Sequence, residues 1–149
     1  MADGGATLLA FDYGRRRIGV AVGNTLTGRA RALETLDAGE QGPDWARITA
    51  LLEDWRPARL VVGVPYNDAQ APAGEAAAAV IAEAQRFARR LHGRYRLPVD
   101  TVDERLSSAA AYDGLRSERR AGRRGQIEKK DIDSAAAAVI LQDWLDNHP

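Results

Sequence analysis

Cysteine is missing from this chain, which excludes disulfide bonds, thiol nucleophiles and thiolate metal sites. No apolar run approaches the roughly 20 residues that a helix needs to cross a bilayer. Residues 1–9 lack the basic flank and cleavable apolar segment of a signal peptide. The formal net charge is zero, so the overall charge does not indicate a nucleic-acid partner, although a local concentration of charge still can. We therefore expect a cytoplasmic protein with no membrane attachment.

What the chain does contain is typical of a globular protein. Hydrophobic residues make up 45% and charged residues 28%, a balance that supports a sizeable core. The length of 149 residues predicts a single domain over residues 1–149, with a frayed, glycine-rich start at residues 1–6. The sequence has no Walker-type phosphate loop, and Gly14 and Gly19 do not form a dinucleotide-binding fingerprint.

The first third of the sequence predicts three antiparallel strands. Thr7–Tyr13 and Arg17–Val22 are strongly apolar, and the connection between them is short enough to require a hairpin. Ala30–Leu36 alternates weakly and predicts a third strand, at the edge of the sheet. Residues 37–43 are rich in turn formers, so we expect a loop there.

Helices and strands alternate in the rest of the chain. Apolar residues at helical spacing predict helices over Asp44–Trp55, Glu75–Leu91 and Asp131–Asn147. Arg59–Val64 has the continuous apolar character of a strand buried on both faces, and Val99–Val102 is a shorter strand. The same patterns predict a helix from residue 107 to about 116, and loops over residues 66–74 and 117–130.

This order of elements predicts an α/β fold with a five-stranded mixed sheet and helices on both faces. With the strands numbered along the chain, the expected order is 3-2-1-4-5, and strands 1, 4 and 5 are parallel. The carboxyl ends of these three strands then meet at one edge. Open α/β sheets usually bind their ligands at such an edge.

Three acidic residues are predicted to meet there. Asp12 ends the first strand, Glu104 follows the last strand, and Asp133 opens the final helix. Three carboxylates at close range repel one another unless cations compensate them, and Mg²⁺ or Mn²⁺ with oxygen ligands meets this need. Two such ions about 4 Å apart can hold a phosphodiester and activate a water molecule for in-line attack.

Each of these acids also has a purely structural interpretation. Asp12 would cap the turn after its strand and form an ion pair with Arg15 or Arg17. Asp133 would cap the N-terminus of the final helix, where the helix dipole stabilises a carboxylate. Glu104 would form an ion pair with the residue that follows it. The convergence of all three acids on one edge favours the metal site over these separate explanations.

Basic side chains are concentrated just before the final helix. Residues 116–130 contain seven arginines and lysines against two glutamates, a local net charge of +5. A basic loop beside an acidic metal site is suited to hold a polyanion, whereas most charge runs are only solvated surface. The predicted nucleic-acid ligands in this segment are Arg119, Arg120, Arg123 and Arg124. The arginines between residues 86 and 96 are instead expected to form a solvated helix face.

Four motifs, in this order, resemble the YqgF family: FDYGRRRIGVAV, VVGVPYN, VDERLS and DIDSAAAAVILQDWL. The resemblance extends from about residue 7 to residue 146. Members of the YqgF family are RNase H-like nucleases, described as Holliday-junction resolvases and as nucleases of pre-16S ribosomal RNA. The resemblance implies an RNase H-like fold and a metal-dependent acidic triad, which falls on Asp12, Glu104 and Asp133.

The resemblance also implies roles for three residues outside the triad. Arg17 and Arg105 match basic family positions that suit phosphate contact or orientation of the carboxylates. Asn67 matches an asparagine of the family and is expected to contact nucleic acid. The chain departs from the family at Asp68-Ala69-Gln70, where a Met and an Asp/Asn-Gly turn are usual. Substrate contacts are therefore not carried over to residues 68–72.

The sequence thus predicts a nuclease that uses Mg²⁺ or Mn²⁺ to hydrolyse phosphodiester bonds, as a monomer or homodimer. The favoured substrate is the precursor of 16S ribosomal RNA, during ribosome biogenesis, and branched DNA is the alternative. A non-catalytic nucleic-acid-binding module is the alternative from another class, and erosion of the triad would indicate it. Asp131 is a nearby acid that could assist or replace Asp133, although the family pattern favours Asp133.

Overall fold

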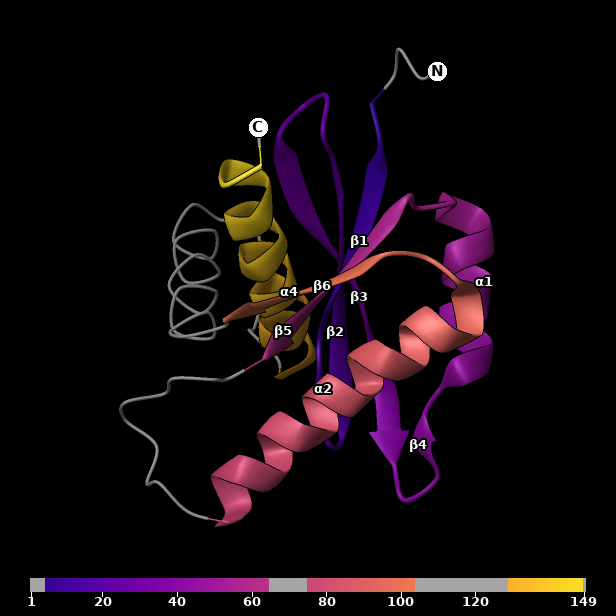
Figure 1. The fold of residues 1–149 in the computed structure, drawn as a ribbon, viewed down its shortest axis with the longest axis vertical. Coiled ribbons are helices and arrows are strands. Elements are labelled where there is room, and N and C mark those ends of the chain that lie inside the picture. The colour runs from indigo at the N-terminus through magenta and orange to yellow at the C-terminus, as the bar shows by residue number, and fades with distance from the viewer. Residues whose placement is uncertain (1–4, 65–74, 104–128, 149) are drawn as a thin grey trace.

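The computed structural model of the protein describes residues 5–64, 75–103 and 129–148. These residues form a six-stranded mixed sheet of order β4-β3-β2-β1-β5-β6, with helices packed against both of its faces (Figure 1). The predicted helix from residue 107 and the predicted loop over residues 66–74 lie outside the described residues. So does most of the predicted loop over residues 117–130.

The antiparallel half of the sheet contains the strands predicted from the first third of the sequence. β1 (Thr7–Asp12) pairs with β2 (Arg17–Asn24), and β2 pairs with β3 (Arg29–Gly39). The prediction of a loop over residues 37–43 was wrong, because β3 continues to Gly39 and turns back into β4 (Gly42–Pro43). Backbone hydrogen bonds, which do not depend on an apolar pattern, hold this extension to its neighbours.

The parallel half lies on the other side of β1. β5 (Arg59–Val64) pairs with β1, and β6 (Val99–Asp103) pairs with β5, both in parallel. The predicted strand order is therefore confirmed, with the short β4 as a sixth strand at the far edge. The carboxyl ends of β1, β5 and β6 lie at one edge, as expected, because Asp12 is aligned with Gly63 and Gly63 with Val102.

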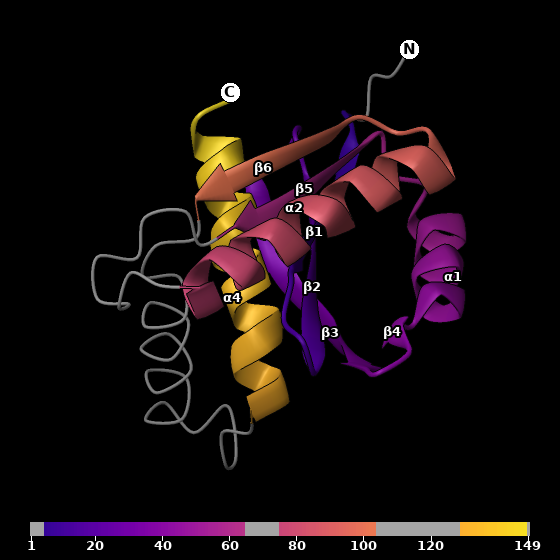
Figure 2. The same ribbon diagram turned by 60° about the horizontal axis from the view of Figure 1, so that its bottom comes forward.

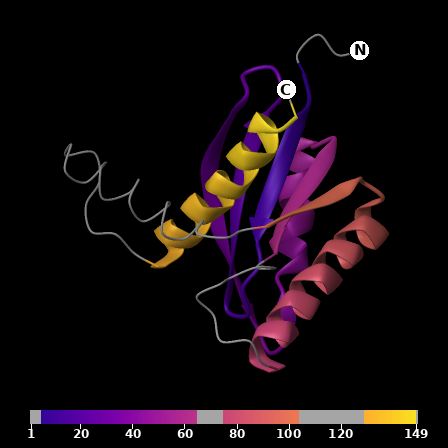
Figure 3. The same ribbon diagram turned by 60° about the vertical axis from the view of Figure 1, so that its left-hand side comes forward.

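The helices enclose the sheet from both sides. α1 (Trp45–Trp55) and α2 (Glu75–Tyr95) cover one face, and α4 (Lys129–Asp146) covers the other (Figures 2 and 3). α1 begins as predicted, because the Asp44 side chain caps it by accepting a hydrogen bond from the backbone N–H of Arg47. No helix in the described ranges is long and apolar enough to cross a bilayer.

Two separate cores result, one on each face of the sheet. The core under α1 and α2 contains large residues such as Phe11, Ile48 and Phe87. The core under α4 includes small ones, among them Ala10, Ala21 and Ala137, which allow the helix to lie close to the sheet. This close approach determines the geometry of the candidate site.

Candidate active site

Asp12 lies at the end of β1 on the face of the sheet that α4 covers. Leu8 and Ala10 belong to the core under α4, and strand alternation places Asp12 on the same face. Its neighbours across the strands are Gly19 on β2 and Gly63 on β5. The Asp12 carboxylate is half-buried, and neither neighbouring residue on the adjacent strands carries a side chain.

Gly19 brings the start of α4 against the sheet. A Cβ atom at residue 19 would overlap the backbone carbonyl of Asp133 and would lie 2.9 Å from the backbone N of Ser134. Gly19 is directly opposite Asp12, so this contact places Asp133 beside the cross-strand neighbour of Asp12. This role of Gly19 was not predicted from the sequence. A glycine inside an apolar strand was the available signal, because it often marks a close backbone approach.

Arg17 fixes the side chain of Asp133. It lies on the same face of β2 as Gly19, and its Nε donates a hydrogen bond of 2.5 Å to Asp133 Oδ2. The two side chains are 31% and 24% exposed, so the pair is only partly screened by water. The hydroxyl of Thr35 on β3 donates a 2.6 Å hydrogen bond to the Lys130 carbonyl and anchors the first turn of α4.

The position of α4 decides whether Asp133 caps the helix and whether Asp131 can take its place. α4 begins at Lys129, so Asp133 lies inside the helix and does not cap it. Asp131 is two residues from Asp133 along α4, and residues at that spacing do not face the same way. Asp131 therefore lies on a different side of α4 from the carboxylate that Arg17 holds.

Arg15, the other predicted partner of Asp12, reaches α2. Its Nε and Nη2 donate hydrogen bonds of 2.9 Å and 2.6 Å to the two carboxylate oxygens of Glu83. This pair connects the turn after Asp12 to the middle of α2. The turn itself requires Gly14, because a Cβ there would lie 2.5 Å from the carbonyl oxygen of Arg17.

The Arg15–Glu83 pair affects the titration of its neighbours. Hydrogen bonding to Arg15 lowers the pKa of Glu83 below its ordinary value of 4.5. Burial raises the pKa of Tyr13, and the Glu83 carboxylate raises it further. The folded state therefore favours the charged form of Glu83 and the neutral form of Tyr13.

Replacing Glu83 by glutamine is expected to cause a small, pH-dependent loss of stability. Because the folded-state pKa of Glu83 is lowered, its contribution is complete above pH 4.5 and is lost as the pH falls through the folded-state pKa. Thermal melts of the wild type and Glu83→Gln should differ slightly at neutral pH and converge in acid. A difference that persists below both pKa values would show that the carboxylate charge is not the cause.

Seven residues predicted to act at this site lie outside the described residues, and nothing here places them. They are Asn67, Glu104, Arg105, Arg119, Arg120, Arg123 and Arg124. In the part of the chain that the structure describes, no group of three or more His, Cys, Asp or Glu side chains could hold a metal ion. The triad assignment, and Glu104 within it, stays a prediction.

The described residues nevertheless suit a hard divalent cation. Asp12 and Asp133 offer carboxylate oxygens, which such cations prefer, from elements held together at Gly19.

Comparison with known proteins identifies the family. The model of the RuvX Holliday junction resolvase family matches residues 6–147. The chain belongs to the RuvX family. This is the family to which the YqgF motifs of the sequence pointed, and that prediction is confirmed.

Relatives of this RuvX chain include two proteins with the provisional name pre-16S rRNA nuclease. One, from Pseudomonas putida, is 46% identical over 139 residues, which cover 93% of this chain and 94% of the relative. The other, from Azotobacter vinelandii, is 45% identical over 147 residues, covering 99% and 98%. The similarity extends over nearly the full length of both relatives.

Solved structures share the fold at low sequence identity. RuvC of T. thermophilus, in complex with a Holliday junction substrate, aligns with a TM-score of 0.58 at 19% identity, covering 94% of this chain and 93% of RuvC. The yeast mitochondrial Holliday junction resolvase Ydc2 aligns with a TM-score of 0.54 at 12% identity, covering 93% and 77%. The RNase H-like fold predicted from the sequence is confirmed.

Proposed function

We propose that this RuvX-family protein is a metal-dependent endonuclease that processes the 5′ end of pre-16S ribosomal RNA. The observation that carries the proposal is the contact of the Asp133 backbone with Gly19, directly opposite Asp12. This contact brings two carboxylates to the sheet edge where open α/β folds bind ligands. The provisional names of the relatives from Pseudomonas putida and Azotobacter vinelandii support the choice of substrate.

In this proposal Asp12, Asp133 and Glu104 hold Mg²⁺ or Mn²⁺. In sequence, Glu104 directly follows Asp103, the last residue of β6. The bound ion would polarise the scissile phosphodiester and lower the pKa of a water molecule. The triad binds and positions that ion.

Arg17 acts as a positioning residue in the same proposal. Its hydrogen bond occupies Oδ2 of Asp133 and orients the carboxylate, so that Oδ1 can serve as an ion ligand. The guanidinium also offsets part of the repulsion between the clustered carboxylates. Substrate phosphates would be held by residues that lie outside the described ranges, namely Asn67, Arg105, Arg119, Arg120, Arg123 and Arg124.

The experiment that tests the substrate compares two labelled nucleic acids under one set of conditions. Purified protein is incubated with a pre-16S ribosomal RNA fragment or with a four-way DNA junction, each with Mg²⁺ and with a chelator. We expect divalent-dependent cleavage of the RNA near the mature 5′ end. Preferential cleavage of the junction would favour the resolvase function, which the family description and the RuvC fold support. Binding without cleavage under any divalent ion would indicate a non-catalytic module.

The basic segment before α4 gives a separate prediction. Neutralising Arg119, Arg120, Arg123 and Arg124 together should weaken RNA binding and flatten its dependence on salt. Each phosphate contact that is lost removes about one unit of slope from the plot of log affinity against log salt concentration. Fluorescence anisotropy over a range of salt concentrations measures this slope. If binding is unchanged at every concentration, the segment is only a solvated loop.

A further inference from the structure

The second half of α2 carries charge of one sign. Residues 84–97 contain five arginines and one histidine but no acidic residue, in a chain whose formal net charge is zero. All five arginines are exposed: Arg86, Arg89, Arg90, Arg94 and Arg96. From the sequence alone, these arginines were expected to form only a solvated helix face. Their arrangement in the fold is a reason to assign them a binding role.

Two of these arginines are held in place by an aromatic ring. The guanidinium carbons of Arg90 and Arg94 lie 4.9 Å and 4.2 Å from the centre of the Trp45 ring. Trp45 is itself fixed, because its ring packs 5.7 Å from that of Phe87 and 6.4 Å from that of Tyr95. Stacking restricts a guanidinium while leaving its in-plane N–H groups able to donate to phosphate. Ordering two arginines in advance reduces the entropy cost of binding a ligand.

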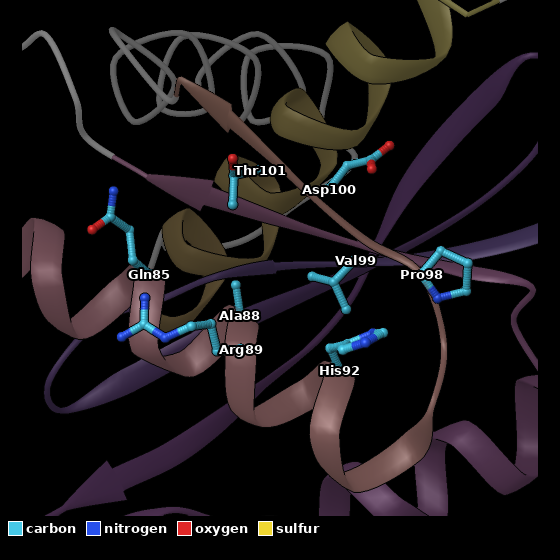
Figure 4. Close-up of a pocket in the computed structure, with 8 residues that line it drawn as sticks. All are labelled: Gln85, Ala88, Arg89, His92, Pro98, Val99, Asp100 and Thr101. Atoms are coloured by element: carbon cyan, nitrogen blue, oxygen red, sulfur yellow. The ribbon is translucent and has the colours of Figure 1, made fainter.

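The other side of α2 borders a cleft of about 800 Å³ between this helix and β6 (Figure 4). Ala88 and Val99 contribute apolar surface to the cleft. Its polar groups come from Gln85, Arg89 and His92 on α2 and from Asp100 and Thr101 on β6. The exposed side chains of α2 from Arg86 onward are therefore polar or basic, from the side that faces α1 to the side that faces β6.

The arginine face begins beside the turn that follows Asp12, on the side of the sheet opposite the Asp12 carboxylate. Arg15 follows Asp12 by three residues, and its ion pair with Glu83 places it beside α2. Arg86 lies one turn beyond Glu83 on the helix, and Arg90 lies one turn beyond Arg86. From Arg86 to Arg94 the helix rises about 12 Å. The guanidiniums thus follow one another from the turn after Asp12 along the second half of α2.

We propose that this face of α2 binds the phosphate backbone of the RNA segment that flanks the cleavage site. The inference rests on the proposed function, because it describes how the same substrate is held outside the acidic edge. The positive charge of this face suits a polyanion. Arg15 links the face to the turn after Asp12, which favours the RNA strand that passes the sheet edge. Guanidinium groups suit this role because they pair with phosphates through two N–H donors.

The test compares two triple variants that lose the same charge. Arg86→Gln/Arg90→Gln/Arg94→Gln removes the proposed contacts. Arg29→Gln/Arg31→Gln/Arg56→Gln is the matched control, because these three arginines are also exposed and Arg31 also stacks on a tryptophan, 5.4 Å from the centre of Trp55. Binding of a labelled single-stranded RNA is followed by fluorescence anisotropy across salt concentrations, in a chelator so that no cleavage occurs.

The α2 variant is expected to lower the salt slope by about two units, at roughly 0.7 per phosphate contact on a single strand, and to weaken binding at low salt by about tenfold or more. The control variant should have a salt slope and a low-salt affinity close to those of the wild type. Equal effects of the two variants would overturn the inference, since they would show a response to net charge alone. If the triple variant does not fold, Arg86→Gln/Arg89→Gln should still lower the slope by about 1.4 units, and an unchanged slope would overturn the proposal.

Cleavage by the wild-type protein is scored separately. If the wild type cleaves RNA and the α2 variants keep the wild-type salt slope of RNA binding, the arginine surface is rejected and the nuclease proposal stands. A lowered slope with no cleavage under any divalent ion would support the RNA-binding surface and reject the nuclease.

Discussion

Asp12→Asn should abolish divalent-dependent hydrolysis and leave the metal-free protein at least as stable as the wild type. The substitution keeps the shape of the side chain but removes the charge that holds a cation. An ion that contributes several kcal/mol of transition-state stabilisation accounts for a loss of at least about a thousandfold in rate. Metal-free stability should be unchanged or slightly higher, because repulsion from Asp133 and Glu104 is relieved.

If Asp12 has only a structural role, Asp12→Asn should change stability in the opposite direction. If the carboxylate serves as the anion of a buried pair, its loss should cost roughly 3–5 kcal/mol and leave hydrolysis largely intact. Urea unfolding in a chelator, combined with a cleavage assay at equal folded protein, separates the two cases. Asp143→Asn is the control, since it removes the same charge from an exposed position on α4. A destabilised Asp12→Asn protein that still cleaves would end the assignment.

Gly19→Ala should be strongly destabilising although it adds a single methyl group. The new Cβ would overlap the Asp133 carbonyl and crowd the Ser134 backbone N, and neither backbone atom can rotate away as a side chain can. The start of α4 must therefore shift, at a cost of about 1–3 kcal/mol or more. The shift should also move Asp133 away from Asp12, and a displacement of about 1 Å can cost roughly a hundredfold in rate.

Gly39→Ala is the matched control, because a Cβ at residue 39 has no atom within 4 Å and the backbone there is compatible with alanine. Urea unfolding and cleavage at equal folded protein should therefore distinguish the two alanine variants clearly. If Gly19→Ala matches Gly39→Ala in both measurements, the contact between β2 and α4 does not position the carboxylates.

The sequence was sufficient to predict the sheet because its signals are local. Apolar runs at residues 7–12 and 59–64 mark buried strands, and the helical spacing between strands requires parallel crossovers. The position of Asp12 at the end of a strand follows from the same signals. This is why one edge of the sheet, and one acid on it, could be predicted before the fold was seen.

Contacts between distant parts of the chain could not be predicted in the same way. Arg17 and Asp133 are 116 residues apart, and only the close packing of α4 on Gly19 brings them together. Helix ends were also misjudged where the local signal was weak. The helix predicted over Glu75–Leu91 continues to Tyr95, and Arg96 then adopts a positive φ of 57°.

The central claim is that the carboxylates at the sheet edge hold the ion that catalyses hydrolysis. The most direct measurement is the rate of pre-16S ribosomal RNA cleavage as a function of Mg²⁺ concentration, for wild type and Asp133→Asn at equal folded protein. We predict no cleavage by the wild type in a chelator, a saturable rise with Mg²⁺, and no such rise for Asp133→Asn. Cleavage that persists in the chelator, or an unaltered Mg²⁺ response in Asp133→Asn, would contradict the claim.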